Sequence, residues 1–219
     1  MIGSLRLAPA KLVALTFLSI GIVILMQVIL PLLSFQVWLF GQKYNDSLLI
    51  TPKPKRSPQI LGVSVQTQDR FPAFVSSIIR ETKPNYDEFS LTVPKLKIET
   101  FGVLVDSNDL SKKLAHLPGS ALPGEKGNVF ISGHSALSQF FSMRKAVFAH
   151  LLDLKKGDQI FISAAGTQFA YQVLGIKVVD PQDVSVIAPP DTSGRYLSLM
   201  TCVPPGLNTK RLVVLAKMI

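Results

Sequence analysis

The chain has 219 residues, which is enough for one domain of ordinary size and a targeting segment. Hydrophobic residues make up 47% of it and charged residues only 17%, while the formal net charge is +9. That charge would suit an anionic surface, but the Lys and Arg residues are scattered and form no basic cluster interleaved with aromatic residues. The pattern of a nucleic-acid-binding protein is therefore excluded.

The excess of hydrophobic residues has its source near the N-terminus. No charged residue occurs from Leu12 to Gln42, and the run from Leu12 to Phe35 is apolar apart from four polar side chains. A helix needs about 20 apolar residues to cross the hydrocarbon core of a membrane. A cleaved signal peptide would have a shorter apolar region and a small-residue cleavage site, which is absent here. We expect residues 12–35 to be an uncleaved transmembrane signal anchor that contacts membrane lipid.

Two basic residues before this segment, Arg6 and Lys11, predict its orientation. Basic residues favour the cytoplasmic side, and a first helix usually inserts with its upstream basic residues inside. Basic residues that follow the segment weaken this argument without reversing it. We therefore expect a single-pass protein of the cell membrane, with residues 1–11 as a cytoplasmic stub and the rest of the chain outside.

Residues 36–88 have the composition of an extracytoplasmic linker. Three prolines between Thr51 and Pro58 predict an extended, solvated segment. The run from Phe71 to Arg80 is compatible with a short helix, which Pro84 and Asn85 would stop. This region is expected to be a spacer with some local structure and not a second domain.

From residue 89 the pattern changes to short runs rich in branched residues, separated by Gly, Pro, Asn and Asp, as is typical of strands. The turn at Ala164–Thr167 predicts a hairpin. Only Phe140–Leu154 has apolar residues near helical spacing. Mostly short strands with one brief helix predict a closed β-barrel or a sandwich, with residues 89–219 as its domain. The expected strands are Ser90–Ile98, Phe101–Val105, Asn128–Gly133, Gln159–Ser163, Gln168–Val179, Arg195–Cys202 and Arg211–Lys217.

Cys202 is the only cysteine, so it cannot form an internal disulfide. A lone thiol outside the cytoplasm is an intermolecular bridge, a buried passenger or a reactive group, and the buried passenger is the commonest case. Cys202 ends an apolar run and is followed by Val203-Pro-Pro-Gly206, which places the thiol at a strand end beside a loop. This position favours a nucleophile. A thiol with a pKa of about 8.5 then needs a cation or a base nearby.

Arg211 is the obvious cation, because it begins the next expected strand after a short loop. Its guanidinium can favour the thiolate or donate hydrogen bonds to the oxygen of a tetrahedral intermediate. The alternative is that Arg211 only caps a strand edge. Lys210 competes for either role, but strand alternation sends it to the opposite face.

His134 is the strongest candidate for a base, since it follows an apolar strand and Gly133 allows close backbone approach. His116, at the start of a loop, ranks second. His150 ranks third, because it lies in the expected helix among apolar residues, where a structural histidine is commoner. One cysteine and three separated histidines have no zinc-ligand spacing, and no Gly-rich phosphate loop occurs. We therefore expect no metal and no cofactor.

Together these segments resemble the sortases, the membrane-anchored cysteine transpeptidases of bacterial cell envelopes. The similarity covers residues 89–219 in the order of the family. The pair Thr201-Cys202, with Arg211 shortly after it and a Gly-His pair after an earlier apolar strand, is specific only in combination. The segments that carry the resemblance are Thr92–Leu96, Leu117–Ser135, Leu154–Asp158 and Leu197–Val214.

The resemblance implies a closed eight-stranded β-barrel with one or two short helices. One strand beyond the seven expected is then either missed or lies between Asp106 and Asn128. It also implies that Cys202 is the nucleophile, His134 the general acid and base, and Arg211 the stabiliser of substrate and oxyanion. His116 matches an auxiliary histidine, and Thr201 the residue before the cysteine; both are expected near the substrate. Ser135 departs from the Arg that often follows the Gly-His pair.

The implied reaction cleaves a C-terminal LPxTG-like sorting motif of secreted proteins. The acyl group passes through a thioester on Cys202 to an amine of the cell envelope. Two alternatives are a cysteine endopeptidase of the same fold, which releases proteins by hydrolysis, and a non-catalytic wall-binding module. The loop from Pro181 to Gly194 is expected to select the sorting motif, but its sequence does not name the motif.

Overall fold

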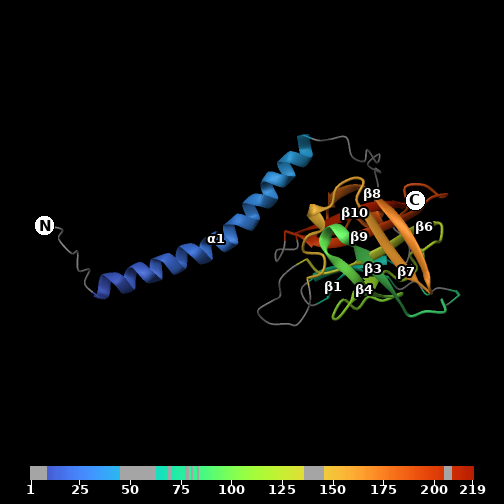
Figure 1. Cartoon of the computed structure of the whole chain (residues 1–219), viewed down its shortest axis with the longest axis horizontal. Coiled ribbons are helices and arrows are strands. Elements are labelled where there is room, and N and C mark those ends of the chain that lie inside the picture. Colours follow the sequence, from blue (N-terminus) through green and yellow to red (C-terminus); the bar gives the residue numbers. More distant parts are fainter. Residues whose placement is uncertain are drawn as a thin grey trace. The chain divides into compact units, whose positions relative to one another are not determined.

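The computed structural model describes residues 9–44, 63–68, 71–76, 79, 81–82, 84–135, 146–204 and 209–219. The chain divides into two compact units, Met1–Asp46 and Ser47–Ile219. The first contains the helix α1 and the second contains the β-structure (Figure 1).

Helix α1 runs without interruption from Pro9 to Tyr44. The helix covers the apolar segment expected at residues 12–35. Pro9 stands at its first position, where the missing N–H leaves no hydrogen bond unmade. Counting only the residues whose placement is described, no helix of the chain is both long enough and apolar enough to cross a membrane.

Eight strands of the second unit form a closed barrel in the order β10-β8-β7-β3-β4-β5-β6-β9. This confirms the expected barrel and excludes the sandwich. Strand β9 pairs in parallel with β6 and antiparallel with β10, so it lies between them. The bounds are β3 Glu88–Val93, β4 Ile98–Leu104, β5 Leu114–His116, β6 Gly127–Ser132, β7 Gln159–Ala164, β8 Thr167–Val179, β9 Arg195–Val203 and β10 Lys210–Met218.

Local chemistry explains several of these strand boundaries. The two-residue loop between β7 and β8 has Ala165 at φ 47° and Gly166 at φ 79°, as a type I′ hairpin requires, and this confirms the expected hairpin. The expected strand Ser90–Ile98 is broken by a 3-10 turn, η1 (Pro94–Leu96), because Pro94 has no N–H to donate to a ladder. The eighth strand, β5, lies between Asp106 and Asn128.

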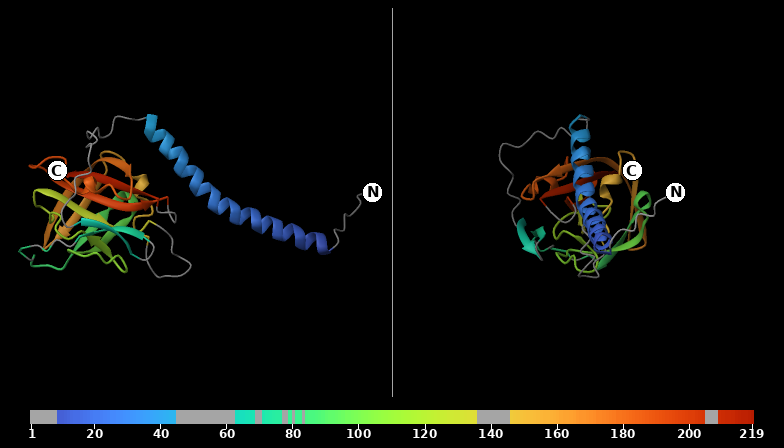
Figure 2. Two further views of the ribbon diagram at one scale, coloured as in Figure 1. Left: turned by 180° about the vertical axis from the view of Figure 1, so that it is seen from behind. Right: turned by 90° about the vertical axis from the view of Figure 1, so that its left-hand side faces the viewer.

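The helix expected from Phe71 to Arg80 was wrong. Strand β2 (Phe71–Ser76) pairs with β1 (Val63–Gln68) in a separate two-stranded sheet. The cause is tertiary, because Phe74 is buried against residues of the barrel. Figure 2 shows this hairpin on the outer side of the barrel.

The helix expected at Phe140–Leu154 falls partly outside the described residues, since residues 136–145 are not described. The remainder forms a turn and the short 3-10 helix η2 (Leu151–Asp153). Phe148 and Leu151 are fully buried there. Their burial anchors this turn without a full helix.

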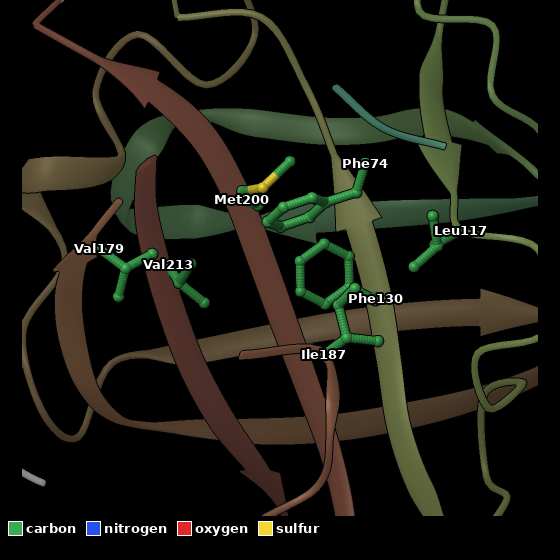
Figure 3. Packing of buried hydrophobic residues seen from close by; sticks show 7 residues of the cluster. All are labelled: Phe74, Leu117, Phe130, Val179, Ile187, Met200 and Val213. Carbon is green, nitrogen blue, oxygen red and sulfur yellow. The ribbon is translucent and has the colours of Figure 1, made fainter. Parts of the chain in front are cut away.

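An apolar cluster lies on the outside of the barrel. Phe74 comes from the separate hairpin and Ile187 from η3 (Val184–Ile187), so both pack on the barrel from outside. The rings of Phe74 and Phe130 meet at a centroid distance of 5.9 Å (Figure 3). The cluster comprises Phe74, Leu117, Phe130, Val179, Ile187, Met200 and Val213. It covers the outer faces of β6, β9 and β10. The predicted site residues lie at one end of these same strands.

Candidate active site

Cys202 and Arg211 are directly opposite each other in the antiparallel pair of β9 and β10. Opposite residues of such a pair project to the same face, with Cβ atoms about 5 Å apart. The structure therefore brings Arg211 to the sulfur, as the sequence predicted. Cys202 is partly exposed, whereas Arg211 is fully buried and donates from Nη1 to the Lys210 carbonyl at 3.0 Å.

Burial and charge act in opposite directions on the Cys202 thiol. Burial raises its pKa above the ordinary value, and the neighbouring Arg211 charge lowers it, with burial the larger effect. Burial also lowers the pKa of Arg211, which the sulfur opposes. The thiolate is thus a minor species at neutral pH, and the arginine charge increases its population.

Lys210 lies on the other face of β10, as alternation requires. Its side chain is exposed, and Nζ contacts Asp180 Oδ1 at 2.5 Å. The position of Lys210 removes it as a competitor for the thiol.

His134 follows the end of β6, which runs parallel to β9. The last register pair of the two strands is Ser132 with Met200, and Gly133 N donates to Met200 O at 3.1 Å. Carboxyl ends of parallel neighbours meet at one edge of a sheet. The edge that carries Cys202 therefore also carries His134, which is partly exposed and lines a small cavity with Phe101, Val147 and residues 110–114.

Gly133 is required by close packing. A Cβ at this position would lie 2.5 Å from Leu114 Cδ2 and 2.6 Å from Phe148 Cδ2. The His134 carbonyl accepts a hydrogen bond from Phe148 N at 3.0 Å. These contacts fix the backbone that presents the imidazole.

Thr201 is 1% exposed, and its Oγ1 donates to Gly133 O at 2.8 Å. Ser135, which directly follows His134 in the sequence, is also buried at 3% exposure. The structure thus links Thr201 to the strand that carries His134. Its expected contact with substrate stays a prediction.

His116 lies in β5 and not in a loop, and it is fully buried. Its Nδ1 accepts from Asp106 N at 3.2 Å, and its Nε2 lies 2.9 Å from Ala121 O. A carbonyl only accepts, so the proton of this tautomer is on Nε2. The ring joins β5 to the loop after it, and its auxiliary role at the substrate stays a prediction.

His150 lies on the surface, with its side chain 76% exposed and Nδ1 3.2 Å from Asp153 Oδ2. It is a surface residue and not the satisfied structural histidine that the sequence suggested. Among the residues that the structure describes, no three His, Cys, Asp or Glu side chains gather into a possible metal site.

The sequence reasoning missed the outer surface beside the thiol. Alternation along β9 and β10 places Met200 on the face of Cys202, and Val213, opposite Met200, on the face of Arg211. Asn128 Nδ2 donates to Ile187 O and to Ser198 Oγ, both at 3.0 Å, and so fastens η3 over this face. Alternation within each strand could have indicated this surface. The sequences of the segments that cover it do not indicate where they pack.

Comparison with known proteins agrees with this architecture. Sortase D of Bacillus subtilis (strain 168) is 32% identical over 131 residues, which are 58% of this chain and 61% of the relative. The chain thus spans about three fifths of that relative. Sortase A from Corynebacterium diphtheriae, in a lid mutant, matches with a TM-score of 0.55 and 32% identity over 61% of this chain and 70% of that one.

A pilus-related sortase C of Group B Streptococcus matches with a TM-score of 0.54 and 33% identity, over 63% of this chain and 69% of that one. Relatives named sortase A, C and D are thus similar to a comparable degree, and they single out no subclass. The family model of the sortase domain matches residues 91–219, more than half of the chain. The chain belongs to the sortase family.

Proposed function

We propose that this protein is a membrane-anchored cysteine transpeptidase that joins secreted proteins to an amine of the cell envelope. Its donor would be a C-terminal LPxTG-like sorting motif. One observation carries the proposal: Cys202 and Arg211 are paired across β9 and β10 at the edge where β6 delivers His134. Nucleophile, cation and acid–base group thus come from three adjacent strands.

In the first half-reaction, Cys202 Sγ attacks the carbonyl carbon of the scissile peptide bond as the thiolate. The oxygen gains negative charge, which guanidinium N–H groups of Arg211 stabilise. Protonated His134 gives its proton to the leaving amine, and the C–N bond breaks. The product is a thioester between the donor and Cys202.

In the second half-reaction, the acceptor amine attacks the thioester carbon. His134 takes the proton from the amine, and the C–S bond breaks as the new amide forms. Cys202 leaves as the thiolate. The same groups would hydrolyse the thioester with water, so selection of the amine over water separates a transpeptidase from an endopeptidase.

We also propose that residues 12–35 anchor the protein in the cell membrane, with the N-terminus in the cytoplasm and residues 89–219 outside. The support comes from the sequence, in which no charged residue occurs from Leu12 to Gln42 and the basic residues Arg6 and Lys11 precede this run. Protease added to intact cells should digest the C-terminal domain and leave a tag at the N-terminus. Release of the whole protein by a high-salt wash would contradict an integral anchor.

The reaction can be tested with the full chain in detergent, an LPxTG-type peptide and triglycine in excess. Mass spectrometry should show a thioester on Cys202 and a ligated product that depends on the amine. The Cys202→Ala variant should give neither. An amine-independent hydrolysis product would indicate an endopeptidase, and binding to cell walls with an unreactive thiol would indicate a binding module.

A further inference from the structure

Thr201 precedes Cys202 in β9, yet its side chain lies on the other side of the strand. Successive residues of a strand point to opposite faces. Thr201 is 1% exposed and lies opposite Leu212, which is fully buried. Its side chain is therefore directed into the barrel, away from the face that a donor bound at Cys202 would occupy.

The Thr201 hydroxyl is engaged within the protein. Oγ1 donates to Gly133 O at 2.8 Å, across 68 residues of sequence. Backbone pairing of β6 and β9 reaches Ser132 with Met200, followed by the bond from Gly133 N to Met200 O. The Thr201 bond carries the connection between the strands one step further, to the carbonyl directly before His134.

The remaining contacts of this backbone leave it little freedom. Gly133 is packed against Leu114 and Phe148, and the carbonyl of His134 accepts from Phe148 N. The Thr201 hydroxyl adds a contact from the strand that carries the nucleophile. It joins the residue before Cys202 to the residue before His134.

We propose that Thr201 is a positioning residue, whose hydroxyl holds the ends of β9 and β6 together and so keeps the His134 imidazole within proton-transfer distance of the leaving amine of a donor attacked by Cys202. The inference rests on the proposed function and assigns Thr201 a role other than substrate binding. Proton transfer needs heavy atoms about 3 Å apart. A displacement of about 1 Å can lower a rate by about 100-fold.

The test removes the hydroxyl and keeps the shape. Thr201→Val retains the branched side chain in the core, while Thr201→Ser retains the hydroxyl. With the full chain in detergent, LPETG peptide and triglycine, Thr201→Val should lower kcat per titrated Cys202 by about 10- to 100-fold. The donor KM should stay within about threefold of wild type, since ground-state binding is unchanged. Thr201→Ser should restore most of kcat.

Thr92→Val is the matched control. Thr92 lies in β3, and its Oγ1 accepts from Thr100 N at 3.2 Å, so this variant also removes one bond between side chain and backbone. Its kcat and donor KM should equal those of wild type. A raised donor KM with unchanged kcat in Thr201→Val would overturn the inference in favour of substrate contact. Lower stability with unchanged kcat per titrated thiol would overturn it in favour of a purely structural role.

Amide hydrogen exchange tests the same bond without substrate. In Thr201→Val the Gly133 amide should exchange about tenfold faster, because the carbonyl bond beside it is lost. Amides of the β7–β8 hairpin should exchange as in wild type. Unchanged exchange at Gly133 in Thr201→Val would overturn the inference, whether or not the wild-type protein forms a thioester. Failure of the wild-type protein to form a thioester would refute only the proposed function.

Discussion

Arg211 is fully buried opposite Cys202, while the sulfur beside it keeps partial access to solvent. A buried guanidinium next to a thiol stabilises negative charge more strongly than an exposed one, because water screens it less. The same positive charge is available to a carbonyl oxygen that becomes negative during attack by the sulfur. One residue can therefore act on the nucleophile before the reaction and on the oxyanion during it.

Replacing Arg211 should impair acylation far more than replacing its neighbour. We expect Arg211→Gln to lower the rate of thioester formation by about 100- to 1000-fold, as loss of an oxyanion donor does in other acyl transfers. Rapid-quench mass spectrometry of Cys202 measures this rate. Lys210→Gln is the control, since Lys210 is exposed on the opposite face and pairs with Asp180. An equal loss in both variants would refute a specific role for Arg211.

Alkylation of Cys202 by iodoacetamide should depend on pH in a direction that burial determines. Burial raises the pKa of Cys202, so the rate should still be rising at a pH where an ordinary thiol has reached its plateau. Arg211→Gln should move the midpoint further upward, because the charge that lowers the pKa is gone. Quenching the alkylation at set times and measuring modified Cys202 by mass spectrometry gives the midpoint of the rate against pH for wild type and for Arg211→Gln. A midpoint that falls in Arg211→Gln would contradict the electrostatic account.

The pair of Cys202 and Arg211 could be predicted because it depends on local sequence. A short loop joins two apolar runs, and alternation then separates Arg211 from Lys210. Strand β5 could not be predicted, because its three residues, Leu114–His116, are all buried and show no alternation. Hence His116 was expected in a loop and lies in a strand.

Contacts between distant segments were the other limit. Apolar residues from Phe71 to Arg80 fit a helical period as well as a strand, and only the packing of Phe74 against Phe130 and Met200 decides between them. The hydrogen bond from Thr201 to Gly133 joins β9 to β6, and the sequence of neither strand indicates that the two are neighbours. The family resemblance associated His134 with Cys202 and Arg211, but it did not indicate this bond.

Phe74 should make the hairpin β1–β2 part of the folded unit. An isolated two-stranded sheet is marginally stable, and Phe74 is 4% exposed within the outer cluster (Figure 3). We expect Phe74→Ala to lower the free energy of unfolding by about 3 kcal/mol, as cavity formation does in other cores. Urea denaturation followed by far-UV circular dichroism measures the change in the free energy of unfolding.

Ile79→Ala is the control for Phe74→Ala. Ile79 follows the same hairpin but is 91% exposed. Its replacement should change the free energy of unfolding by less than about 0.5 kcal/mol. Equal stability of wild type and Phe74→Ala would mean that the hairpin does not contribute to the barrel.

Asp191 should make the protein sensitive to acid. Hydrogen bonds from Tyr196 Oη and from the amides of Gly194 and Ser193 lower its pKa to about 2. A carboxylate with a lowered folded-state pKa stabilises the fold above its unfolded value, and this contribution is lost as pH falls toward 2. Between pH 5 and about 2, the Tm of wild type should therefore fall more steeply than that of Asp191→Asn. Parallel slopes in wild type and Asp191→Asn would show that these hydrogen bonds do not favour the ionised form.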